Sequence, residues 1–228
     1  MTDNARCVIH VLSRHGSPIP ECEERLRELE RRGYIIWRAH GSSSDDSMRS
    51  QLASDALAKG FDELMWIGGE IVFDPNDIDR LREHNLPIVG GLVAKTGGRQ
   101  YAAAFLPGTE AITFGKQGGL IEIQYCGFGF LHTRRIVFET IAKQLKLPVC
   151  NTRFGKPLVP YFQPLIIPDG ADASWYLEGD FAFCERARQC GFKTVADTRL
   201  RVSHVGSYSY SWEEAGGDPS KKTDFTRL

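Results

Sequence analysis

Four side chains in this sequence have the chemistry needed to hold a cation and to move a proton. Glu70 follows the apolar run 64–67 across a pair of glycines. Glu178 and Asp180 stand at the start of an amphipathic segment, and His204 comes late in the chain. Carboxylates and imidazoles bind divalent cations, and a carboxylate can also accept a proton from a substrate. The pattern therefore predicts a cation-assisted site for a phosphorylated substrate.

The elements that position these residues follow from the apolar periodicity of residues 1–92. Gly33 and Gly60 are typical helix stops, and Met48, Leu52 and Ala56 are expected to face inward from one helix. The pattern predicts four strands alternating with three helices: strands at 7–12, 34–39, 63–67 and 87–92, and helices at 20–32, from 45 or 46 to 60, and after 76. This alternation predicts a parallel, doubly wound sheet, whose ligands bind beyond the carboxyl ends of the strands.

The pattern changes after residue 92. Antiparallel strands are predicted at 99–105, 109–114 and 120–125, followed by a helix at 133–145, a proline-rich loop, a helix around Asp180 and a strand at 193–196. We expect one α/β domain over 1–228, with a mostly parallel central sheet flanked by helices and a smaller antiparallel part in the C-terminal half. Its parts are a nucleotide-binding half (1–92), an acceptor and catalytic half (93–206) and a tail or lid (207–228).

An ordered set of motifs covers most of the chain, although each is weak alone. The segments are Met65-Trp-Ile-Gly-Gly-Glu-Ile-Val-Phe-Asp-Pro75, Gly127-Phe-Gly-Phe-Leu-His-Thr-Arg-Arg135, Glu178-Gly-Asp-Phe-Ala-Phe-Cys-Glu-Arg-Ala187, Gly191-Phe192 and His204-Val-Gly206. Together they resemble the GT-A type glycosyltransferases, in particular family 2-like members. Two departures stand out. The group's Asp-x-Asp is degenerate here, as Gly68-Gly69-Glu70, and its Gly-Glu-Asp is here Glu-Gly-Asp.

The resemblance implies a sugar transfer from a nucleoside diphosphate donor, most simply a UDP-sugar, to a hydroxyl acceptor of unknown class. It implies an inverting reaction with Asp180 as general base, assisted by Glu178. The other implied roles are metal binding for Glu70 and His204 (Mn²⁺ or Mg²⁺), donor binding for Ser13, Arg14, Ser42, Arg49, Gly68 and Gly69, and acceptor binding for Trp175 and Tyr176. Plainer roles stay open: a loop acid for Glu70, a helix cap for Asp180 and core packing for Trp175.

Composition and missing motifs argue against several classes of function. The chain has 28 basic and 29 acidic residues, and a net charge of −1 argues against a broad nucleic-acid surface. No signal-peptide core or membrane-length apolar run is present, which predicts a cytoplasmic protein with reduced cysteines. Neither a P-loop nor a dinucleotide-binding Gly-x-Gly-x-x-Gly follows the first strand. Two alternatives remain: a catalytically silent relative that binds nucleotide or glycan, and a nucleotidyltransferase.

Overall fold

The structure is a computed structural model. It describes residues 4–13, 16–40, 45–95 and 100–206, together with the backbone of 209–210 and 224–226. Among these residues, no helix is both long and apolar enough to cross a membrane.

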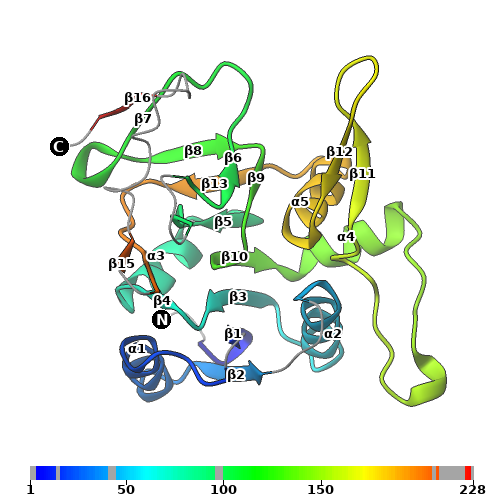
Figure 1. Ribbon diagram of the computed structural model, residues 1–228. Coiled ribbons are helices and arrows are strands. Elements are labelled where there is room, and N and C mark those ends of the chain that lie inside the picture. The colour runs from blue at the N-terminus through cyan, green and yellow to red at the C-terminus, as the bar shows by residue number, and fades with distance from the viewer. Residues whose placement is uncertain are drawn as a thin grey trace.

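A seven-stranded sheet forms the centre of the molecule, in the order β2-β1-β3-β10-β5-β13-β8 (Figure 1). Five strands run in one direction, whereas β10 and β8 run antiparallel to their neighbours. The bounds are β1 Cys7–Ser13, β2 Ile35–His40, β3 Glu63–Gly68, β5 Ile88–Gly90, β8 Leu120–Ile123, β10 Phe130–Arg134 and β13 Thr194–Asp197. The predicted mostly parallel sheet is confirmed.

Five α-helices cover the two faces of this sheet: α1 Pro20–Arg31, α2 Asp45–Ala58, α3 Asn76–Glu83, α4 Arg135–Gln144 and α5 Gly179–Gln189. Apolar side chains of α1 and α3 pack with Ile9 of β1 and Met65 of β3 in one core cluster. Those of α2, α4 and α5 pack with Val8 and Trp66 in a second cluster on the opposite face. Because successive strand residues point to opposite faces, β1 and β3 supply side chains to both clusters. The helices on the two faces and the sheet between them form a three-layer α/β/α arrangement.

Short strands form small sheets around this core. The paired strands are β4 (Ile71–Val72) with β14 (Ser203–Val205) and β15 (Ser209–Tyr210), β6 (Ala103–Ala104) with β9 (Tyr125–Cys126), β7 (Ala111–Thr113) with β16 (Asp224–Thr226), and β11 (Leu165–Pro168) with β12 (Ser174–Leu177). Three 3₁₀ turns, Asn4–Arg6, Gly115–Gln117 and Thr152–Phe154, complete the described structure. Strands therefore exist where they were predicted after residue 92, but they are shorter than the sequence suggested. β6 and β8 pair antiparallel with their neighbours as expected, whereas β7 pairs in parallel with β16, which corrects the expectation for 109–114.

The predicted helix at 133–145 was wrong at its start. Residues 130–134 instead form β10, which lies in the middle of the sheet between β3 and β5. The buried Thr133 hydroxyl has a polar partner there: it accepts a hydrogen bond from the Trp66 indole N–H at 3.0 Å. A buried central strand containing His132 and Thr133 lacks a continuous apolar run, so its pattern did not identify it.

The inner face of α2 also differs from the expectation. Ala56 is buried as expected, but Met48 and Leu52 are half-buried, and Ser50 and Ala53 are the residues that point fully inward. Small side chains allow the segment 157–162 to approach the helix closely. The Ser50 hydroxyl accepts a hydrogen bond from the backbone N–H of Phe162 at 3.2 Å.

Candidate active site

The carboxyl ends of β1 and β3 meet as the sequence predicted. The backbone N–H of Gly69 donates to the carbonyl of Leu12 at 2.8 Å. A Cβ on Gly69 would lie 2.1 Å from the hydroxyl oxygen of Ser13, so only glycine fits this close contact. The Ser13 hydroxyl is buried and has no hydrogen-bond partner among the described residues. A polar group is therefore left unsatisfied at the point where a ligand is expected.

Glu70 and His204 lie side by side on the backbone. The carbonyl of Glu70 accepts from the N–H of Val205 at 2.8 Å, and His204 pairs with Ile71 across β14 and β4. The Glu70 carboxylate turns back over Gly68, where its Oε2 lies 3.5 Å from the position of a Cβ on that glycine. Among the described residues, this carboxylate has no hydrogen bond or ion pair with another side chain.

His204 is half-buried, and its Nδ1 lies 3.2 Å from the carbonyl oxygen of Ala94. If Nδ1 carries the hydrogen and donates it to this carbonyl, the ring lone pair is on Nε2. This is the tautomer that a metal-binding histidine uses, with its second nitrogen oriented by a backbone carbonyl. A carboxylate and an imidazole are ligand types that suit a borderline divalent ion such as Mn²⁺, so both residues have the chemistry for the predicted role.

Asp180 is held at two points. Its Oδ2 accepts the backbone N–H of Phe128 at 2.9 Å, and its Oδ1 lies 3.3 Å from Nη1 of Arg49. Its side chain is 25% exposed, so the carboxylate still reaches solvent. A carboxylate has about four lone-pair positions, and two contacts leave room to accept a substrate proton. The expected inward orientation of Asp180 agrees with these contacts.

Arg49 was expected to face a donor phosphate, but in this structure it contacts carboxylates. Its guanidinium lies between Asp180 and Asp45, the latter at 3.7 Å, and over the ring of Phe128. Its Nε is buried without a partner among the described residues. Asp45, four residues earlier on the same helix, joins Asp180 as a partner of Arg49, and its i,i+4 spacing from Arg49 was the sequence signal for this pair.

A single turn, residues 127–129, connects the two acidic positions. The carbonyl of Gly129 accepts the N–H of Gly68 at 2.9 Å, while Phe128 next to it binds Asp180. A Cβ on Gly127 would lie 3.7 Å from Oδ2 of Asp180. The Glu70 turn and the Asp180 carboxylate are therefore positioned by adjacent residues of the same backbone turn. We call Glu70, His204, Arg49 and Asp180 the carboxyl-edge cluster.

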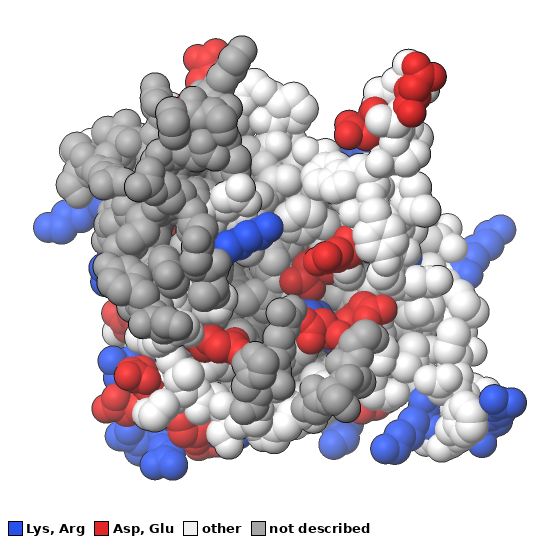
Figure 2. All heavy atoms as spheres, in the orientation of Figure 1, with Lys and Arg blue, Asp and Glu red and all other residues white. Residues whose placement is uncertain are grey.

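The first turns of α2 and α5 pack against each other at this cluster. A Cβ on Gly179 would lie 3.0 Å from Cβ of Asp46 and 2.9 Å from the carbonyl oxygen of Phe162, so a side chain here would force the neighbouring backbone to move. Figure 2 shows Asp and Glu side chains gathered near the centre of this face, over the starts of α2 and α5. Glu178, at the N-cap position of α5, is exposed and makes no side-chain cap. Helix N-termini stabilise negative charge, which offsets part of the repulsion between these acids.

Trp175 and Tyr176, the expected acceptor-binding residues, face opposite sides of the β11–β12 hairpin. Trp175 is half-buried, and its ring packs at 5.5 Å from Tyr125 and 6.1 Å from Phe181. Tyr176 is 59% exposed and pairs with Ile166, which is 71% exposed. The hairpin leads directly into Glu178 and Asp180. Tyr176 is therefore an exposed ring, Trp175 packs the hairpin onto the core, and acceptor contact by either residue stays a prediction.

Some expected site residues lie outside the described structure. Arg14 and Ser42 belong to undescribed stretches, as do the side chains of the expected lid over 207–228. For the lid, the described structure gives the backbone of β15, which pairs with β14 beside His204, and of β16, which pairs with β7.

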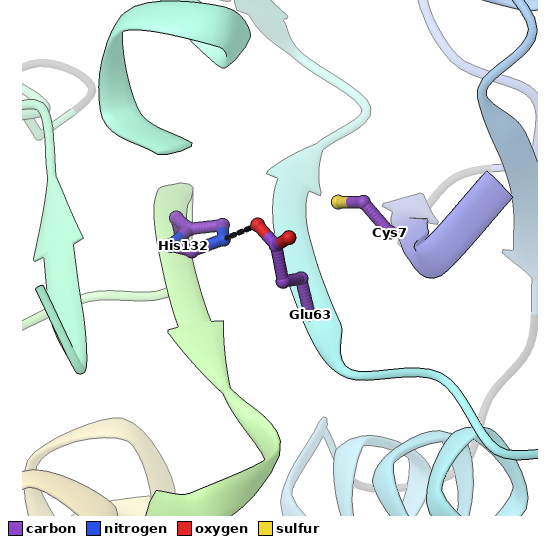
Figure 3. Close-up of side chains that lie close together, drawn as sticks. All are labelled: Cys7, Glu63 and His132. Carbon is purple, nitrogen blue, oxygen red and sulfur yellow. Dashed lines mark hydrogen bonds and ion pairs between the residues drawn. The ribbon is translucent and has the colours of Figure 1, made fainter. Parts of the chain in front are cut away.

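A second group of ionisable side chains lies at the opposite, amino ends of the same strands. Cys7 begins β1, Glu63 begins β3, and His132 lies beside them on β10 (Figure 3). Their candidate ligand atoms lie within 4.8 Å of one another, and His132 Nε2 is 2.8 Å from a Glu63 oxygen. No motif or spacing in the sequence indicated this group. With Arg82, we call it the amino-edge cluster.

Arg82 makes the amino-edge cluster a poor cation site. Its guanidinium donates to both oxygens of Glu63, at 2.9 and 3.1 Å, and its third nitrogen donates to Asn4 and Tyr34. These contacts and His132 hold the pKa of Glu63 well below its usual range against the opposing effect of burial. Burial raises the pKa of the Cys7 thiol to about 12, which disfavours the thiolate that a metal would need. The cluster is a buried ion pair with neighbouring polar groups.

Comparisons with known proteins support the fold. The structure is similar to that of A197 from STIV, with a TM-score of 0.56 and 14% sequence identity over 97% of each chain. It is also similar to GalNAc-T7 with UDP, GalNAc and Mn²⁺, with a TM-score of 0.50 and 13% identity. This match covers 98% of the present chain and 47% of the GalNAc-T7 chain. No protein-family model and no curated protein sequence matches this chain. At these identities the likeness establishes a GT-A-like fold.

Proposed function

We propose that this protein transfers a sugar from a nucleoside diphosphate donor, most simply a UDP-sugar, to a hydroxyl acceptor. The observation that carries the proposal is the single turn 127–129, which positions both the Glu70 turn and the Asp180 carboxylate at the carboxyl edge of a GT-A-like sheet. The similar fold of GalNAc-T7, whose structure contains UDP, GalNAc and Mn²⁺, supports a nucleotide-sugar donor.

In the proposed reaction, Asp180 accepts the proton of the acceptor hydroxyl. The acceptor oxygen then bonds to the anomeric carbon as the bond from that carbon to the diphosphate oxygen breaks, releasing UDP. Attack from the face opposite the leaving group inverts the configuration. General-base catalysis of this kind contributes about 10²- to 10⁴-fold in rate. Arg49 acts as a positioning residue, because it holds one oxygen of Asp180 and leaves the other on the Phe128 N–H.

Glu70 and His204 are the residues that we propose for a divalent ion. When bound there, such an ion would neutralise charge on the diphosphate leaving group. The Glu70 carboxylate covers the space above Gly68, and the orientation of His204 by the Ala94 carbonyl suits a neutral imidazole ligand. Ser13, Gly68 and Gly69 would line the donor site with Arg14 and Ser42, and donor contact by Arg49 stays a prediction. Tyr176 and Glu178 would face the acceptor.

Donor hydrolysis tests this proposal directly. The protein is incubated with Mn²⁺ and each of several UDP- and GDP-sugars, and release of free nucleoside diphosphate is measured. We expect release from one donor class and loss of release in Asp180→Asn, whereas the matched change Asp172→Asn in the hairpin loop has no effect. Thermal stabilisation by UDP without turnover of any donor would instead identify a nucleotide-binding module. The absence of both thermal stabilisation and donor turnover would contradict the proposal.

A further inference from the structure

The connection between α4 and β11 has an unusual charge pattern. Between Glu139 and Asp169 the sequence contains no Asp or Glu, although the whole chain has slightly more acidic than basic residues. The same stretch contains four basic residues, and all of them are exposed: Lys143, Lys146, Arg153 and Lys156. Within the described structure none of these four forms an ion pair. This part of the surface therefore has an unbalanced positive charge.

Residues 146–157, which we call the basic loop, extend away from the body of the molecule (Figure 1). Figure 2 shows Lys and Arg side chains gathered at the same corner. Two backbone hydrogen bonds between Cys150 and Leu158, at 2.8 and 3.1 Å, close the loop. Asn151 and Gly155, both with left-handed φ angles, bound the 3₁₀ turn at its tip. The loop is thus preformed, which lowers the conformational entropy lost on docking.

The return segment of the basic loop is fixed to the helices beneath it. The Ser54 hydroxyl accepts the N–H of Val159 at 2.9 Å, and the buried Arg186 donates to the carbonyls of Tyr161 and Gln163 at 3.2 and 2.6 Å. Burial lowers the pKa of Arg186 to about 10, and these carbonyls compensate its desolvation. The loop is therefore a fixed projection from the α2–α5 side of the protein.

Two apolar side chains are displayed among these charges. Phe154 is 65% exposed at the tip, with the guanidinium of Arg153 4.5 Å from its ring centroid, and Val149 is 60% exposed. Basic groups beside exposed apolar groups suit the interface of an anionic bilayer, where the ring enters the headgroup region and the cations meet lipid phosphates. Valine can neither stack on a base nor bind a phosphate, which argues against nucleic acid. A stable protein interface needs about 800 Å² on each partner, more than one short loop offers.

We propose that the basic loop docks this protein reversibly on a membrane surface rich in anionic lipids. Each basic residue close to such a surface contributes about a fivefold change in partitioning, so three of them contribute roughly a hundredfold. The contribution is screened by salt, since the charges are exposed. This inference does not depend on the reaction proposed above.

Cosedimentation of the full chain with vesicles tests the inference. We expect binding to phosphatidylcholine vesicles that contain phosphatidylserine, weak binding to phosphatidylcholine alone, and release at high salt. The triple variant Lys146→Gln/Arg153→Gln/Lys156→Gln should lose roughly a hundredfold in partitioning. The double variant Val149→Ser/Phe154→Ser keeps all charges. Its partitioning onto the vesicles should fall about tenfold, because the two apolar side chains no longer enter the bilayer interface.

The matched control is Arg27→Gln/Arg31→Gln/Lys193→Gln, which removes the same charge from other exposed positions. It should keep most of the binding, and UDP-induced thermal stabilisation should be unchanged in all three variants. Absence of binding to anionic vesicles, or equal losses in the control and the loop variants, would overturn the inference. Loop-dependent binding of a single-stranded oligonucleotide without vesicle binding would also overturn it and would identify a nucleic-acid partner.

Discussion

At the two ends of β1 and β3, ionisable side chains are arranged in opposite ways. In the amino-edge cluster, both oxygens of Glu63 are bound by Arg82, and one of them also contacts His132. In the carboxyl-edge cluster, the Asp180 carboxylate is partly exposed, and Glu70 has no side-chain partner among the described residues. Ser13 and Arg49 each keep a buried polar atom without a partner there.

This difference separates a structural role from a functional one. Breaking a buried ion pair costs several kcal/mol because the remaining charge stays desolvated, so the amino-edge cluster should control folding. Groups that are left partly unsatisfied are available to a ligand, so the carboxyl-edge cluster should control activity. Variants at the two edges should therefore change different observables.

The largest effect is expected at the carboxyl edge. Asp180→Asn should lower the rate of sugar transfer by about 10²- to 10⁴-fold, because the amide cannot accept the acceptor proton. Its free energy of unfolding should change by less than about 1 kcal/mol, since Arg49 keeps Asp45 as a partner. Donor turnover and urea denaturation measure the two quantities. A large loss of stability with normal turnover of the folded fraction would indicate a structural role.

The converse is expected at the amino edge. Glu63→Gln should lower the free energy of unfolding by about 3–5 kcal/mol, because it leaves the Arg82 guanidinium buried without its carboxylate. Folded protein should still be stabilised by UDP. Denaturation midpoints with and without UDP test both statements, and Glu122→Gln, in an exposed pair with Lys193, is the control with little expected effect.

Acid should reveal a third buried group, between the two edges. Burial lowers the pKa of His10 from 6.5 to about 3, and neither ring nitrogen has a described partner. The unfolded chain binds this proton below pH 6.5 and the folded chain does not, so stability is lost as pH falls from 6.5 toward 3. Between pH 7 and pH 4.5, the free energy of unfolding should fall by about 3 kcal/mol less in His10→Phe than in the parent protein. Urea denaturation at the two pH values measures this difference.

The free energy of unfolding of His10→Phe should still fall in acid, because the amino-edge cluster is unchanged in this variant. The lowered pKa of Glu63 means that its stabilisation is present near neutral pH and is lost as pH falls through its folded-state value. The lowered pKa of buried His132 acts in the same direction. If His10→Phe and the parent lost stability in parallel, the assignment of this effect to His10 would be wrong.

A smaller effect is expected for Glu70→Ala. Mutating a residue that only hydrogen-bonds to a metal ligand typically lowers metal affinity 10- to 100-fold, about 1.4–2.7 kcal/mol. Removing the ligand itself should weaken Mn²⁺ binding by at least as much. Calorimetric titration of Mn²⁺ into the UDP complex measures this change. UDP binding without metal should be unaltered, and unchanged Mn²⁺ affinity would remove Glu70 from the site.

The smallest effect is expected on the hairpin. Tyr176→Ser should raise the KM for an acceptor a few-fold, about 0.5–1 kcal/mol, because one exposed ring contact is lost. Donor hydrolysis and the thermal midpoint should not change. Trp175→Ser should instead lower the midpoint, because its ring packs on Tyr125 and Phe181. Equal effects of the two variants on the thermal midpoint would contradict the assignment of a packing role to Trp175 alone.

The sequence by itself predicted the elements whose pattern is local. Short apolar runs located β1 and β3, which are buried on both faces, and the stripe of Cys22, Leu26 and Leu29 located α1, because such local patterns reflect the faces that an element buries. The Gly68-Gly69 pair likewise marked the end of the strand before Glu70, whereas the close contact of Gly69 with Ser13 came only from the structure. The order of motifs predicted the GT-A-like fold.

Tertiary structure alone decided which distant residues meet. β10 is inserted between β3 and β5 from a segment whose polar residues hid it, and through its preceding turn it connects Gly68 with Asp180. The Arg49–Asp180 pair and the Glu63–Arg82 pair join residues far apart in the chain. Such pairings depend on how elements pack across the sheet and not on local periodicity, so no pattern in the sequence identified them.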